Sequence, residues 1–159
     1  MTVVNDDKKK ELLQVHLLYE IEMLKAALKL AQCRCEDKWL QSKIESVVID
    51  LYLIHARNLW QFFFTKDGKS NIAHAGDFLK PSINWLKIVA PLEGTWIKKL
   101  KIKVNDYHSH LSYNRKAEPH IDKKWDLVAL HAEIKRVFNA FVLNCKDTYL
   151  NDEIRNIFN

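Results

Sequence analysis

One apolar segment, Ile44–Phe64, constrains the fold of this chain more than any other feature of its sequence. In the second half of the segment apolar residues fall on almost every side of a helix, which is typical of a central helix. Polar residues nevertheless interrupt it, namely Asp50, His55, Arg57 and Asn58. Burying such groups costs free energy unless they are paired, so their presence needs a structural or a functional explanation.

The composition favours long helices in one domain. The chain has 159 residues, 48% of them apolar, and only three glycines and three prolines. Because few residues break regular structure, long helices are favoured over many short strands. A chain of this length most simply forms one domain, so we expect a single helical domain over residues 1–159.

Apolar periodicity predicts where the helices lie. We expect long helices over about 6–32, 37–64, 92–115 and 123–146, a short terminal helix within 147–159, and no strand. Asp6 or Asp7 is the expected N-cap of the first helix, and Asp122 that of the last long one. The predicted fold class is therefore all-α, a bundle of four principal helices plus short helices.

The same periodicity predicts which side chains face the interior. The second helix is expected to pack through Trp39, Leu40, Ile44, Val47, Val48, Leu51, Ile54, Leu59 and Phe62. Val15 and Val128 are assigned to the inner faces of the first and last long helices, and Glu20 to an outer face. The aromatic run Trp60–Phe64 is interpreted as core or as a contact for another subunit, in preference to a platform for stacked bases.

Charge and cysteine content narrow the class of protein. The net charge of +5 permits a polyanionic partner without requiring one. Cys33, Cys35 and Cys145 form no disulfide framework, and the sequence shows no signal region or membrane span, so we expect a cytoplasmic protein. Cys145 is interpreted as a core cysteine. Because no metal-ligand spacing, phosphate loop or dinucleotide fingerprint is present, no cofactor is expected.

Polar residues gather on two of the predicted helices. On the second, Asp50 and Arg57 lie nearly on one line, and His55 and Asn58 lie on another side. On the third they are dense, namely Asn105, Asp106, His108, His110, Ser112, Tyr113, Asn114 and Arg115. If the two helices pack together, Arg57 and His110 meet in one pocket suited to acid–base chemistry on a phosphodiester. The alternative is an internal salt-bridge network that fixes helix packing.

The segment Asn105–His110, NDYHSH, resembles the signature of HEPN domains (higher eukaryote and prokaryote nucleotide-binding domains). The resemblance implies a small helical bundle, often dimeric, which in many members is a metal-independent endoribonuclease or a toxin. The family motif is an Arg, commonly followed by Asn, and then a His a few residues later. Asn105 and His110 match, but Val104 or Lys103 stands where the Arg is expected, so Arg57 or Arg115 would have to supply the guanidinium.

A second resemblance covers most of the chain and implies no activity. The stretches His-x-Arg-Asn-Leu at 55–59 and His-Leu-Ser-Tyr-x-Arg at 110–115 look like those of a set of uncharacterised bacterial helical proteins. It therefore adds to the expected architecture and leaves the function open.

These residues are compatible with three functions. The first is a regulatory or interaction module, in which polar residues hold the helices in register. The second is an RNA-directed endoribonuclease or toxin-like nuclease, whose candidate catalytic residues are His110, Arg57, Tyr113 and Arg115 and whose candidate binding residues are Asp50, His55, Asn58, Asn105 and His108. The third is a small-ligand pocket lined by Trp60, Tyr113 and His110. The candidate partners are accordingly RNA, another protein, or a second copy of the chain.

Overall fold

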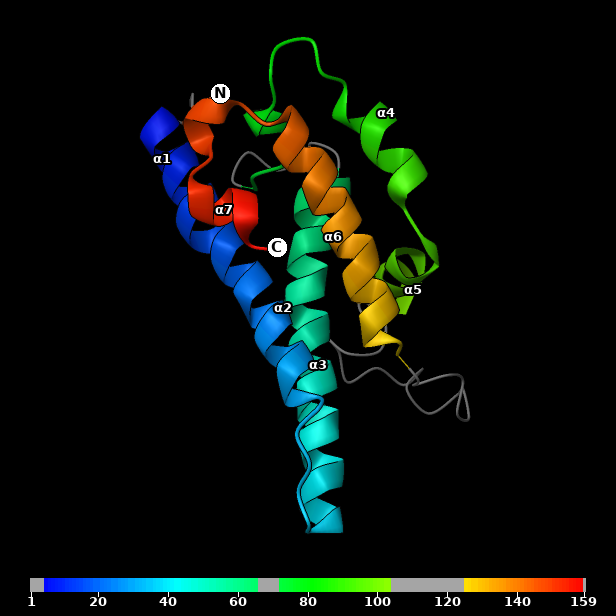
Figure 1. The fold of residues 1–159 in the computed structure, drawn as a ribbon. Helices are drawn as coiled ribbons and strands as arrows, with labels where there is room; N and C mark the ends of the chain where they lie inside the picture. Colours follow the sequence, from blue (N-terminus) through cyan, green and yellow to red (C-terminus); the bar gives the residue numbers. More distant parts are fainter. Residues whose placement is uncertain (1–4, 66–71, 104–124, 159) are drawn as a thin grey trace.

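The computed structural model describes residues 5–65, 72–103 and 125–158, and every regular element in these ranges is a helix (Figure 1). One isolated antiparallel bridge joins Leu79 to Cys145. The predicted all-α class is therefore confirmed. The third predicted helix, 92–115, is described only in its first half, because residues 104–124 lie outside these ranges.

The first long helix of the fold is continuous from Asp6 to Leu30 and has three segments. It consists of α1 (Asp6–Glu11), the π-helical turn η1 (Leu12–Leu17) and α2 (Leu18–Leu30). Its N-cap is Asn5, whose side chain accepts a hydrogen bond from the Asp7 backbone at 2.8 Å. The expectation that Asp6 or Asp7 caps the helix is wrong, because both lie in its first turn, where their carboxylates interact favourably with the positive end of the helix dipole.

The central helix is α3 (Lys38–Phe64), which runs antiparallel to α2 and also packs against α5 and α6 (Figure 1). Asp37 caps it by accepting from the Leu40 backbone at 2.9 Å. Its buried residues begin at Val48 and end at Phe63. The expectation of a central helix is thus right for the second half of α3, whereas no residue before Val48 in this helix is buried.

Short elements connect α3 to α5. The turn η2 (Ala75–Phe78), the short helix α4 (Trp85–Val89) and the turn η3 (Ala90–Leu92) precede α5 (Thr95–Lys103). The Trp85 indole donates to the Phe63 carbonyl at 2.7 Å, which anchors α4 to the end of α3. Ile97 and Leu100 supply the buried side of α5.

The last long helix is α6 (Leu127–Asn144), followed by η6 (Asp147–Tyr149) and α7 (Asp152–Asn156). Asp126 caps α6 by accepting from the Ala129 backbone at 2.9 Å, so the helix begins later than the expected 123. Asp122, the expected N-cap, lies outside the described residues.

Aromatic side chains from four segments meet in the core. Phe141 of α6 packs edge-on against Phe62 and Phe63 of α3, with ring centroids 5.4 and 5.7 Å apart. Phe78 contacts both Phe62 and Tyr149. The interpretation of the Trp60–Phe64 run as core is therefore confirmed for Phe62 and Phe63, which are buried.

Candidate functional site

A polar cluster lies where α2 and α3 pack together, and Glu20 is at its centre. The Glu20 carboxylate lies 2.6 Å from His55 Nδ1 and accepts from the Asn58 amide at 3.1 Å. His55 is only 7% exposed, and the ring of Tyr19 packs edge-on against it. We call Tyr19, Glu20, His55 and Asn58 the groove cluster.

Helix geometry explains why these residues meet. His55 and Asn58 are three residues apart, so they share a side of α3, and that side faces α2. A buried imidazole needs a hydrogen-bond partner, and Glu20 supplies it from the facing helix. The assignment of Glu20 to an outer face is therefore wrong. One sequence signal could have indicated that Glu20 faces inward. Glu20 lies beside the apolar stripe of its own helix, which packs against its antiparallel neighbour α3.

The other two polar residues of the opening segment lie on a different side of α3. Asp50 is exposed and Arg57 is half-buried, with a buried Nε atom. Both take part in an interaction, so neither is an isolated charge. The structure thus brings His55 and Asn58 together with Glu20, and leaves Asp50 and Arg57 along the neighbouring face of the helix.

The remaining candidate residues are Asn105, His108, His110, Tyr113 and Arg115, and they lie outside the described residues. The meeting of Arg57 with His110 therefore stays a prediction.

A second polar contact joins α3 to α6. The Tyr52 hydroxyl lies 3.2 Å from His131 Nδ1. Burial lowers the pKa of His131 below its usual value, and the charges of Lys135 and Lys25 lower this pKa further. Burial also raises the pKa of Tyr52, so its hydroxyl stays protonated and suits a neutral imidazole.

The lysines near His131 also hold the end of the chain. Lys25 donates to the Ile157 carbonyl at 2.5 Å, and Lys135 donates to the Phe158 carbonyl at 2.6 Å. Phe158 packs against the His131 ring. The Tyr52–His131 contact therefore belongs to the packing of the last turn against α2 and α6.

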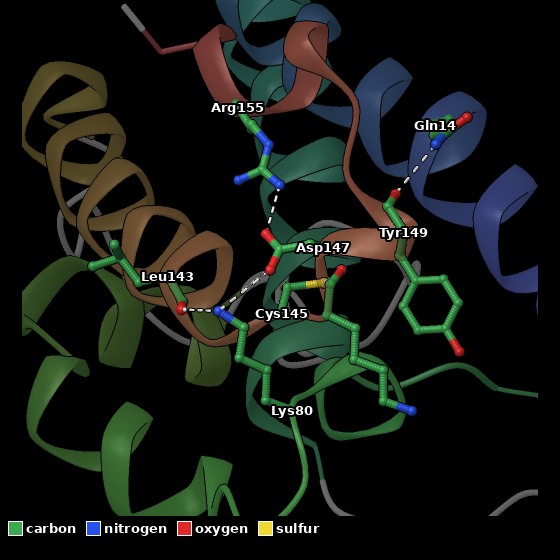
Figure 2. Close-up of polar contacts among 8 residues, drawn as sticks. Gln14, Lys80, Leu143, Cys145, Asp147, Tyr149 and Arg155 are labelled. Carbon is green, nitrogen blue, oxygen red and sulfur yellow. Dashed lines mark hydrogen bonds and ion pairs between the residues drawn. The ribbon is translucent and has the colours of Figure 1, made fainter.

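Figure 2 shows a charged network where α6 ends. Asp147 lies 2.7 Å from Arg155 and 3.8 Å from Lys80, and these two cations lower the pKa of the Asp147 carboxyl. Cys145 is fully buried beside it, and burial raises the pKa of its thiol to about 12. The thiol is therefore protonated at neutral pH, which confirms a core cysteine and excludes a reactive one.

Exposed apolar side chains flank the groove cluster. On α3, Leu40, Val47 and Ile54 are seven residues apart and form one line, with Val47 64% and Ile54 54% exposed. Asn58 is one turn from Ile54 and donates to Glu20 of α2, so this line borders α2. There Tyr19 and Leu30 are exposed as well. We call Tyr19, Leu30, Leu40, Val47 and Ile54 the α2–α3 face.

This exposure corrects several expectations about inner faces. Trp39, Leu40, Val47 and Ile54 were expected to pack in the interior, and all four are exposed. Val15 and Val128 are exposed too, the latter by 67%. The periodicity identified apolar lines correctly, but no described element packs against some of these lines.

Other kinds of site find little support in the described parts of the chain. Those residues contain no group of three His, Cys, Asp or Glu side chains able to hold a metal ion. None of their helices is long and apolar enough to cross a membrane. A cavity beside Trp60, between α3, α5 and α6, measures about 10 Å³, which is the space of one water and too small for a ligand.

Comparison with protein-family models, with curated proteins and with solved structures finds no match for this chain.

Proposed function

We propose that this protein is a HEPN-like bundle of four principal helices that acts in the cytoplasm as a non-catalytic interaction module. The observation that carries the proposal is the α2–α3 face, an apolar surface of five large side chains on two adjacent helices. Large apolar side chains gathered in this way on the surface of a folded chain commonly indicate a site of contact with another protein. The groove cluster beneath the face supports the same function, because it holds the two helices in fixed register.

Crosslinking at one position of the face tests the proposal. A photo-crosslinking amino acid replaces Val47, in the middle of the face, in cells that make the protein. The matched control carries it in place of Val128, which is equally exposed but lies on α6. We expect a protein adduct from position 47 and a much weaker one from position 128. Equal adducts at the two positions, or none at position 47, would remove the proposal.

An RNA-directed endoribonuclease is the second candidate function. Two exposed lysines on α5, Lys98 and Lys101, favour it, because ammonium groups on one helix are suited to phosphate contacts. The helix leads along the sequence toward His110, the candidate acid–base residue. In this case the purified protein cleaves total RNA and the His110→Ala variant does not. Cleavage by neither protein, or identical patterns from both, eliminates the nuclease.

Arg57 separates the two functions by a different measurement. In an interaction module Arg57 holds α3 against its neighbours, so Arg57→Ala lowers the melting temperature by several degrees. In a nuclease it contacts phosphate, so the same variant loses RNA cleavage while its melting temperature changes little.

A further inference from the structure

The N-terminal part of α3, residues 38–47, extends beyond the core of its own chain. None of the ten residues 38–47 is buried, and Figure 1 shows these turns projecting past the ends of α2 and α6, where the 31–37 connector is the only other described segment alongside them. Ten residues of helix span about 15 Å. Trp39, at the tip, is 69% exposed. A helix that projects so far gains little from its own chain, since most helical stability in proteins comes from packing.

The projecting part carries the spacing of a helix–helix seam. Leu40, Ile44, Val47, Leu51 and Ile54 follow one another at intervals of four and three residues. This is the repeat by which two helices pack side by side. Ile44 and Leu51 are half-buried against the core, whereas the other three are exposed. A helix is therefore the element that fits this surface best.

The charges beside the seam are arranged so that α3 can pair with itself. Val47 lies midway between Leu40 and Ile54, and Lys43 and Asp50 lie on either side of it along one edge. When a second α3 runs antiparallel with its Val47 opposite, Leu40 meets Ile54 of the partner subunit. Lys43 then meets Asp50 of the partner subunit, and the reverse pair forms by symmetry.

The other edge of the seam rules out the parallel alternative. In a parallel pair Lys43 and Asp50 would face the opposite edge of the second helix. That edge consists of Val48 and His55, which are buried against the core and α2. Asp50 already takes part in an interaction, but its carboxylate has two oxygens and can accept a further contact from Lys43 of the second copy. The charge pattern thus selects an antiparallel second copy.

We propose that this chain forms a symmetric dimer through the α2–α3 face, with the two α3 helices antiparallel about Val47. The dimer rests on the proposed function, because it names the partner of the same face. It also gives the projecting turns a neighbour, since each tip then lies beside Ile54 and Tyr19 of the partner subunit. Two helices about 10 Å wide over about 25 Å give a footprint near 500 Å², below the about 800 Å² per partner of a standard interface. We therefore expect a reversible dimer with a dissociation constant in the micromolar range.

Sedimentation velocity over a concentration series, from about 1 to 300 µM, measures the self-association. We expect the wild type to shift from monomer to dimer in this range. Val47→Glu should weaken the association at least about tenfold, because it puts a charge in the middle of the seam. Val128→Glu, at a position of equal exposure, should leave it unchanged. A wild-type monomer at every concentration, or equal effects of the two variants, refutes the dimer.

Charge reversal tests the antiparallel arrangement separately. Lys43→Glu places two carboxylates together and should weaken the dimer about two- to fivefold, as expected of exposed ion pairs. Adding Asp50→Lys to that variant restores the pair and should return the association to within about twofold of wild type. Failure of the double variant to recover refutes this register.

The crosslinking experiment keeps the two proposals distinguishable. An adduct at position 47 that contains only this chain supports the dimer. An adduct with a different protein, together with a monomeric purified chain, refutes the dimer and leaves the interaction module standing. Absence of any adduct at position 47 counts against both.

Discussion

Gly94 is a position where one added methyl group should destabilise the protein, because the methyl group would meet the Glu133 carboxyl group. It precedes α5, and its carbonyl accepts the first bond of that helix from the Lys98 backbone at 3.0 Å. Gly94 has no side chain to cap the helix, and Glu133 of α6 caps it instead. The Glu133 carboxylate accepts from the Trp96 and Ile97 backbones at 3.3 and 2.9 Å. A Cβ at position 94 would overlap that carboxyl group.

The expected change in the free energy of unfolding follows from the loss of the helix cap that Glu133 provides. Gly94→Ala pushes the half-buried carboxylate away, and losing a helix cap costs about 0.5–2 kcal/mol. The alanine also restricts the unfolded chain, which returns about 0.4–1 kcal/mol. From the middle of these two ranges we expect a net loss near 0.5 kcal/mol, or a melting temperature lower by about 1–2 °C for a chain of this size.

The assay is a double-mutant cycle followed by circular dichroism during thermal and urea unfolding. Once Glu133→Ala has removed the carboxylate, Gly94→Ala meets no overlap and should stabilise the protein by up to about 1 kcal/mol. The control is Gly76→Ala, since a Cβ there has nothing within 4 Å; it should not destabilise. Equal destabilisation by Gly94→Ala with and without Glu133 would refute the reasoning.

Two further predictions concern His131, which is half-buried, and His55, which is buried. The folded state lowers the pKa of His131, so the unfolded chain binds its proton more readily; stability is full above the unfolded pKa of about 6.5 and falls as pH drops below it. Urea unfolding at pH 7.5 and 5.5 should therefore show a smaller pH-dependent loss in His131→Gln than in wild type, and identical slopes would contradict the assignment. Glu20→Gln should cost about 1 kcal/mol, because it replaces the charged acceptor that the groove cluster gives buried His55 with a neutral one. Its control, Glu22→Gln on the exposed side of α2, should change the unfolding free energy little, and equal losses would show that the cluster contributes nothing specific.

The groove cluster shows which contacts local sequence patterns can predict and which they cannot. The sequence marks His55 and Asn58 as polar residues in an apolar helix, and their spacing alone predicts that they share a side. It does not identify Glu20 as their partner, because that pairing depends on which side of α2 meets α3. Residues separated by 35 positions come together only through the antiparallel packing of the two helices.

The cap of α5 is a second case of the same kind. Thr95 is the only preferred N-cap residue beside Gly94 in the sequence, so a local pattern does not point to a cap from another helix. Glu133 reads in turn as an ordinary polar residue of α6. Their contact exists because α6 packs against α5, and no rule of sequence spacing connects them.

By itself, the sequence determined the all-α class, the approximate bounds of the described helices and the central place of Leu59–Phe63. These follow from local propensity and apolar periodicity, which act within one helix at a time. Only the tertiary structure decided which apolar lines are covered. Val47 and Val48 are adjacent and equally apolar, yet Val48 is buried and Val47 is exposed. The difference arises because α2 and the core lie on one side of α3, and no described element of the same chain covers the other.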